Sequence, residues 1–160
     1  MTTMAPIGIT VPKLLPIAGT WAVPFVLYNT ILSSRIVSTR IQNDYYCGDK
    51  LPSSSPTNTK TPPDVLQTAT RCHANFLENV PLAFILLIIA ELNGGNRKAL
   101  NYMMGTLFAL RIAHAELGLK LQGKFGDNGV GRPLGYFGSI GVLGALGGYC
   151  GWLVAGYWGF

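Results

Sequence analysis

The chain has 160 residues, of which 49% are hydrophobic and only 12% are charged. Soluble domains carry about 25% charged residues, and disordered or collagen-like chains carry far fewer apolar ones. This composition excludes a large soluble catalytic domain and favours a compact membrane protein. A membrane-spanning helix takes about 20 apolar residues, so four of them would occupy about half of the chain.

The net charge of +5 does not indicate a nucleic-acid-binding protein, because Lys and Arg form no long run and instead flank apolar segments. The three cysteines, Cys47, Cys72 and Cys150, are too few and too scattered for a disulfide framework or a zinc site. We therefore expect thiols, no bound metal and no nucleic-acid partner.

The first half of the chain predicts two spans. Residues 12–34 are apolar and contain prolines, which membrane helices tolerate. The polar segment 35–64, rich in Asn, Ser, Thr and Pro, predicts a cytosolic loop. A second helix is predicted over residues 65–92, because Asp64 is a suitable N-cap and Asn93-Gly94-Gly95 terminates a helix.

The second half predicts spans over residues 98–119 and 133–158, the last one opened by Pro133. Its glycines form a stripe along which another backbone can approach closely, namely Gly141, Gly144, Gly148 and Gly151. The predicted fold is therefore a single all-α domain over residues 1–160, a polytopic membrane four-helix bundle.

Basic residues indicate the orientation. Most of them follow the first and third spans, whereas the other side holds only Lys13, Arg97 and Lys98. The positive-inside rule then places both basic loops in the cytosol and both termini outside or in a lumen. The sequence predicts a multi-pass protein of the endoplasmic reticulum or another endomembrane in a eukaryote, or of the plasma membrane in a bacterium.

Several polar residues lie where membrane helices normally exclude them. Arg71, Asn75 and Glu78 share one face of the second helix, and Arg111 and His114 share one face of the third. An arginine in the middle of a membrane costs at least about 2.5 kcal/mol. Glu78 is therefore the predicted partner of Arg111. Such a pair either fixes only the register of the helices or belongs to a binding site.

A polar, positive pocket open to the cytosol is predicted where these groups converge. Arginine binds carboxylates through paired hydrogen bonds, and Asn75 and Glu78 would serve an ammonium or peptide group. This donor set fits a small zwitterionic peptide with excess carboxylate, such as glutathione. The arginines at the cytosolic helix ends are Arg35, Arg40, Arg71 and Arg132.

The stretch 71–81 resembles the signature of the MAPEG family, the membrane-associated proteins in eicosanoid and glutathione metabolism. Its pattern is Arg-x-x-x-Asn-x-x-Glu-x-x-Pro, formed by Arg71, Asn75, Glu78 and Pro81. The resemblance runs from Leu32 through the fourth helix and is closer to the uncharacterised bacterial-type branch. It implies a four-helix protomer, usually a homotrimer, with glutathione between adjacent protomers on the cytosolic side.

The resemblance also implies roles for single residues. Arg132 falls where family members place an arginine near the glutathione sulfur, here expected from an adjacent protomer, and Tyr136 matches a tyrosine of the prostaglandin E synthase branch. Arg40, or otherwise Arg35, matches the arginine that ends the first helix. The cofactor-binding positions implied for glutathione are Arg40, Arg71, Asn75, Glu78, Arg111 and His114.

Two departures from the family pattern argue against prostaglandin isomerisation. Gly118 stands where several active members have a tyrosine, and Pro133 stands where the isomerising branch has a serine. Generic glutathione chemistry stays open.

We expect a glutathione transferase or peroxidase that acts on lipophilic electrophiles or lipid hydroperoxides drawn from the surrounding membrane lipid. The thiolate of bound glutathione would be the nucleophile, with Arg132 and Tyr136 as its catalytic partners. Two other classes stay open. Gly118 favours a non-catalytic lipid- or glutathione-binding scaffold, whereas a proton-coupled transporter with Glu78 as carrier is disfavoured by the surrounding cations.

Overall fold

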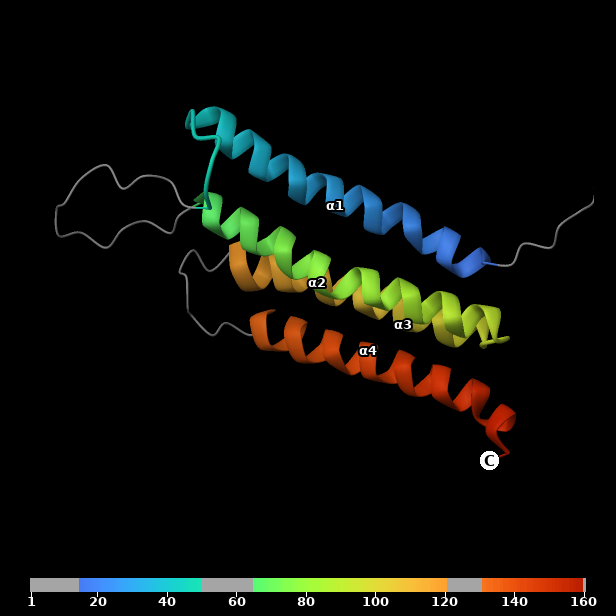
Figure 1. The fold of residues 1–160 in the computed structure, drawn as a ribbon. Helices are drawn as coiled ribbons and strands as arrows, with labels where there is room; N and C mark the ends of the chain where they lie inside the picture. The colour runs from blue at the N-terminus through green and yellow to red at the C-terminus, as the bar shows by residue number, and fades with distance from the viewer. Residues whose placement is uncertain (1–14, 50–64, 121–130, 160) are drawn as a thin grey trace, which may run out of the picture.

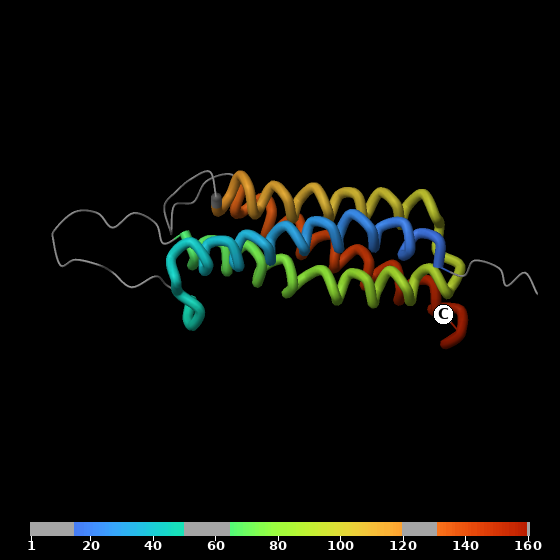
Figure 2. The backbone as a smooth tube through the Cα atoms, turned by 90° about the horizontal axis from the view of Figure 1, so that it is seen from above, coloured from blue at the N-terminus to red at the C-terminus, as the bar shows by residue number. Residues whose placement is uncertain are grey.

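A computed structural model describes residues 15–49, 65–120 and 131–159. Its four α-helices are α1 (Pro16–Gln42), α2 (Val65–Leu92), α3 (Arg97–Ile112) and α4 (Gly131–Val154). A π-helix, η1 (Ala113–Lys120), continues α3, and a short 3-10 helix, η2 (Ala155–Trp158), follows α4. Figures 1 and 2 show the four helices side by side in one bundle. The predicted all-α fold with four helices is confirmed.

The bundle has two distinct ends (Figure 1). The end of α1, the start of α2, the end of η1 and the start of α4 lie together at one end, which we call the basic end. The start of α1 and the end of α4 lie at the other. The basic end carries Arg35, Arg40, Arg71 and Arg132, whereas Arg97 and Lys98 begin α3 at the far end. Lys13, Lys50, Lys60 and Lys124 lie outside the described residues.

The surface of the bundle is strongly apolar. Large side chains such as Ile85 on α2 and Phe137 and Trp152 on α4 are exposed, although a soluble protein seldom leaves so many uncovered. Within the part of the chain that the structure describes, α2 and the stretch Gly131–Trp158 are long and apolar enough to cross a membrane. Both features indicate a membrane protein.

The first helix is longer than the span predicted for it. Residues 35–42, assigned to the loop 35–64, continue α1 as far as Gln42. No glycine or proline interrupts the chain between Pro24 and Gly48, so nothing stops the helix earlier. Residues 12–14 of the predicted span and residues 50–64 of the predicted loop lie outside the described residues.

The third helix also differs from the prediction. Instead of one regular helix over residues 98–119, the α-helix changes at Ala113 into the wider π-helix η1. Such turns are rare and occur often at functional sites. No proline or other helix-breaking residue at Ala113 announces the change in the sequence.

The far end of the bundle is fastened by a carboxylate. Glu91, in the last turn of α2, accepts hydrogen bonds from the backbone N–H groups of Ile17 (2.7 Å) and Ala18 (3.0 Å) in the first turn of α1. These N–H groups have no partner within their own helix and carry partial positive charge. Glu91 therefore ties α1 to α2.

Glycines bring η1 close to α4. A Cβ atom added to Gly118 would lie 2.9 Å from the backbone nitrogen of Arg132, and one added to Gly135 would overlap with His114. The predicted glycine stripe behaves differently. Among the described residues, nothing outside α4 lies within 4 Å of a Cβ atom added to Gly141, Gly144, Gly148 or Gly151, so no described helix packs on the stripe there.

We predict that Gly135→Ala destabilises the bundle, because the added methyl group would push η1 away from α4. Overpacking of this kind costs about 1–3 kcal/mol, which for a chain of this length lowers the apparent Tm by roughly 2–10 °C. Thermal unfolding in detergent measures the effect. Gly147→Ala is the matched control, since its added Cβ meets nothing within 4 Å in the described part of the chain. An equal loss in both variants would contradict the packing argument.

Candidate functional site

Arg111 is buried in the bundle at 3% exposure and bonds to backbone carbonyl groups. Its Nη1 donates to the carbonyl oxygen of Asn75 at 3.2 Å, and its Nη2 donates to the carbonyl oxygen of Gly135. Because these carbonyls belong to α2 and α4, one guanidinium connects three helices.

The predicted direct ion pair between Arg111 and Glu78 is not formed, although the charge of Glu78 still acts on Arg111 from its exposed position. Within the described ranges no ion pair joins the two side chains, and Glu78 lies on an exposed face of α2. The backbone carbonyls take its place, because they are already buried next to the guanidinium and need no carboxylate to leave solvent.

A pocket of about 270 Å³ lies beside this arginine, at the basic end of the bundle. It brings together five of the predicted site residues, Arg71, Asn75, His114, Arg132 and Tyr136, and it adds Leu119. Arg71 and Arg132 line the same pocket within one protomer. That an adjacent protomer supplies Arg132 stays a prediction.

Helical spacing explains why these side chains converge. Arg71 and Asn75 lie one turn apart on α2, and Arg132 and Tyr136 lie one turn apart on α4, so each pair shares a face. His114 is held between them, since its Nδ1 lies 3.2 Å from the carbonyl oxygen of Arg132. The outer side of the pocket is open, because Arg71 and Tyr136 are exposed.

Four other candidates do not line this pocket, and one of them is Arg111, whose guanidinium binds backbone carbonyl groups instead. Glu78 does not line it. Arg40 donates to the carbonyl oxygens of Tyr46 (3.4 Å) and Gly48 (3.2 Å), which follow the end of α1. Arg35 forms an ion pair with Glu116 of η1. A ligand contact by Arg40 or Arg35 stays a prediction.

Two residues at or next to the pocket were not among the predicted site residues. Leu119 carries no signal, because an apolar residue in an apolar helix is unremarkable. Glu116 carries one, since an ionisable residue inside a predicted span is rarely without a function. Its partner Arg35 is 81 positions away in the chain and is not identifiable from spacing.

The arrangement suits recognition of a carboxylate-bearing ligand. Two guanidinium groups, the Asn75 amide and the Tyr136 hydroxyl offer hydrogen-bond donors at the mouth of an otherwise apolar bundle. Charge-assisted hydrogen bonds from arginine are among the strongest that proteins offer to carboxylates. Among the described residues, no group of three or more His, Cys, Asp and Glu side chains is placed to hold a metal ion.

Comparison with protein families gives a match to the MAPEG family over residues 18–152. Neither a comparison with curated proteins nor one with solved structures found a match. The matched range covers most of the chain and includes every residue that lines the pocket. The chain belongs to the MAPEG family.

Proposed function

We propose that this protein is a membrane-embedded, glutathione-dependent transferase or peroxidase that acts on lipophilic electrophiles or lipid hydroperoxides. The observation that carries the proposal is the single pocket in which Arg71, Asn75, His114, Arg132 and Tyr136 meet. Membership of a family associated with glutathione supports the choice of ligand.

The side chains of the pocket are complementary to the charges of glutathione. Arg71 and Arg132 approach from opposite walls, α2 and α4, so each is available to one carboxylate of the peptide. The Asn75 side chain serves a peptide or ammonium group. Holding the peptide at several points fixes the sulfur relative to a second substrate, which is a major source of rate enhancement.

Bound glutathione would supply a thiolate nucleophile. A free thiol has a pKa of about 8.5, so only a few per cent is ionised at neutral pH. The Arg132 guanidinium would favour the ionised form by direct charge attraction. Tyr136, one turn further along α4, would donate a hydrogen bond to the sulfur or to the second substrate.

A second copy of the chain would complete the site. The pocket volume of about 270 Å³ lies at the lower limit of ligand sites, which run from about 300 to 1,000 Å³. Arg71 and Tyr136 are exposed at its mouth, and the glycine stripe of α4 meets no packing partner among the described residues. These features support a homotrimer in which a neighbour covers the ligand.

We further propose four membrane spans with the basic end in the cytosol and both termini on the other side, as the positive-inside rule favours. Glutathione would enter the pocket from the aqueous side, and the lipophilic substrate would arrive through the membrane lipid. The membrane would be an endomembrane in a eukaryote or the plasma membrane in a bacterium.

One observation favours an alternative, a non-catalytic lipid- or glutathione-binding scaffold. Gly118 packs against the backbone of Arg132 so closely that a side chain has no room. The tyrosine that several active family members carry at this position is therefore sterically excluded here. A scaffold would bind its ligand without turnover.

We predict that Arg132→Ala lowers turnover by about 100-fold, the size of effect expected from one preorganised charge partner. Tyr136→Phe should lower it less, because the ring remains in place. Purified protein in detergent is assayed with glutathione and chlorodinitrobenzene or a lipid hydroperoxide. Arg97→Ala, which removes an exposed arginine at the far end, is the control. Unchanged activity in Arg132→Ala would contradict the thiolate assignment.

We predict that Arg71→Ala weakens glutathione binding. Loss of a hydrogen bond to a charged group is worth about 1.5–3 kcal/mol, or about 10–150-fold in Kd. Isothermal titration calorimetry measures it, again with Arg97→Ala as control. Binding by the wild type without turnover would favour the glutathione-binding scaffold, whereas no binding at millimolar glutathione would refute the enzyme and leave only a lipid-binding scaffold.

A further inference from the structure

Glu116 lies at the meeting point of α1 and η1. Its Oε1 accepts a hydrogen bond from the hydroxyl of Tyr28 at 3.2 Å and forms an ion pair with Nη1 of Arg35. Tyr28 and Arg35 are seven positions apart on α1, so they share one face of that helix. The carboxylate therefore receives two donors from the same side.

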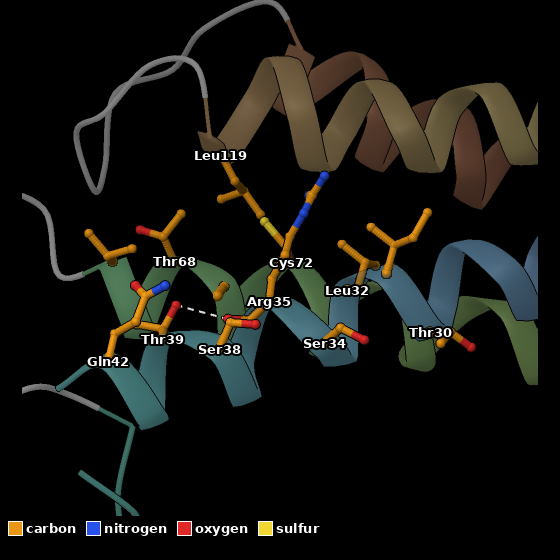
Figure 3. A pocket seen from close by; sticks show the side chains of 13 residues that line it. Thr30, Leu32, Ser34, Arg35, Ser38, Thr39, Gln42, Thr68, Cys72 and Leu119 are labelled. Carbon is orange, nitrogen blue, oxygen red and sulfur yellow. Dashed lines mark hydrogen bonds between the residues drawn. The ribbon is translucent and has the colours of Figure 1, made fainter. Parts of the chain in front are cut away.

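The side chains of Tyr28, Arg35 and Glu116 connect two helices, α1 and η1, whose backbones are not in close contact. Among the described residues, no Cα atom of α1 lies within 8 Å of a Cα atom of η1. A cavity of about 590 Å³ adjoins the pair, lined by Arg35, Cys72, Leu119 and several hydroxyl-bearing residues of α1. Figure 3 shows the Arg35 side chain extending from α1 to the helix that carries Leu119. Long polar side chains, not close packing, connect the two helices here.

The π-helix that Glu116 fastens also forms one wall of the candidate glutathione pocket. His114 precedes Glu116 by two residues and Leu119 follows it by three, and both line that pocket. Leu119 lines the larger cavity as well, so it separates the two spaces. Any shift of η1 toward the larger cavity would therefore widen the pocket.

The other sides of η1 have contacts of their own. The Cys72 thiol of α2 lies 3.7 Å from the carbonyl oxygen of Ala115, as a donor to it. Gly118 and Gly135 allow the close approach to α4. Because π-helical segments longer than a single turn are rare, we expect this one to depend on such neighbouring contacts.

We propose that Glu116 is a positioning residue: held by Arg35 and Tyr28, it fixes η1 and thereby places His114 and Leu119 around the ligand. It touches no substrate itself. This inference rests on the proposed function, because the pocket is taken to bind glutathione. The side chains of Arg35 and Glu116 are 34% and 25% exposed, so neither is fully buried, and we expect the variants to fold.

The test compares two carboxylates that both tie α1 to another helix. Glu116→Gln should raise the Kd for glutathione, measured by calorimetry, by about 5–30-fold, within the usual range of coupling between sites. Glu91→Gln, the matched control, weakens the tie at the far end and should leave that Kd unchanged. Equal effects of Glu116→Gln and Glu91→Gln would overturn the proposal.

A second readout does not depend on glutathione. In a background with Cys47→Ser and Cys150→Ser, which leaves Cys72 as the single thiol, the rate at which N-ethylmaleimide alkylates buried Cys72 reports how firmly η1 is held. Glu116→Gln should raise this rate several-fold, and Glu91→Gln should not. An unchanged Cys72 rate in Glu116→Gln would overturn the proposal.

The two measurements also distinguish a failure of the proposed function from a failure of the proposed role of Glu116. If the wild type binds no glutathione, the proposed function fails, and the Cys72 rates still decide whether Glu116 holds η1. If Glu116→Gln does not fold, Tyr28→Phe removes one hydrogen bond to Glu116 and should produce the same effects on a smaller scale. Wild-type values for Tyr28→Phe in both assays would then overturn the proposal.

Discussion

The guanidinium of Arg111 is the constraint on which the interior of this bundle depends. A buried, charged side chain must be satisfied by hydrogen bonds or it costs several kcal/mol. Arg111 finds its acceptors on the backbones of α2 and α4, at Asn75 and Gly135. These two hydrogen bonds from the Nη atoms of Arg111 therefore fix the relative height of three helices.

The pocket follows from that alignment. Asn75 lines the pocket with its side chain and binds Arg111 with its carbonyl group. Gly135 accepts from Arg111 on one side and lets His114 approach on the other. Asn75 and His114 thus both line the site and take part in contacts between helices. Substitutions in this region would affect stability and ligand binding together, so matched controls are needed to separate them.

Much of the fold and most of the site were predictable from the sequence, because the signals are local. Asn93-Gly94-Gly95 marks the end of α2, and the turn-by-turn spacing of Arg71 and Asn75 on α2, and of Arg132 and Tyr136 on α4, defines two polar faces. The family signature then relates these faces to one ligand. Five predicted residues line one pocket as a result.

Three features were not predictable, because no residue type or spacing in the sequence indicates them: the acceptors of Arg111, the pairing of Arg35 with Glu116, and the π-helix. Every residue has a carbonyl group, so nothing distinguishes those of Asn75 and Gly135 as the acceptors for Arg111, and Glu78 was the more obvious candidate. Arg35 and Glu116 are too far apart in the chain for spacing to pair them. The change to a π-helix at Ala113 is likewise decided by packing against neighbours.

The central claim is that the pocket at the basic end binds glutathione, and a structure of the protein determined in a lipid environment with glutathione tests it most directly. The account predicts density for the tripeptide in contact with Arg71, Asn75, Arg132 and Tyr136, with its sulfur nearest Arg132 and Tyr136. Density elsewhere, for example in the cavity beside Arg35, or an empty pocket at saturating glutathione would contradict it.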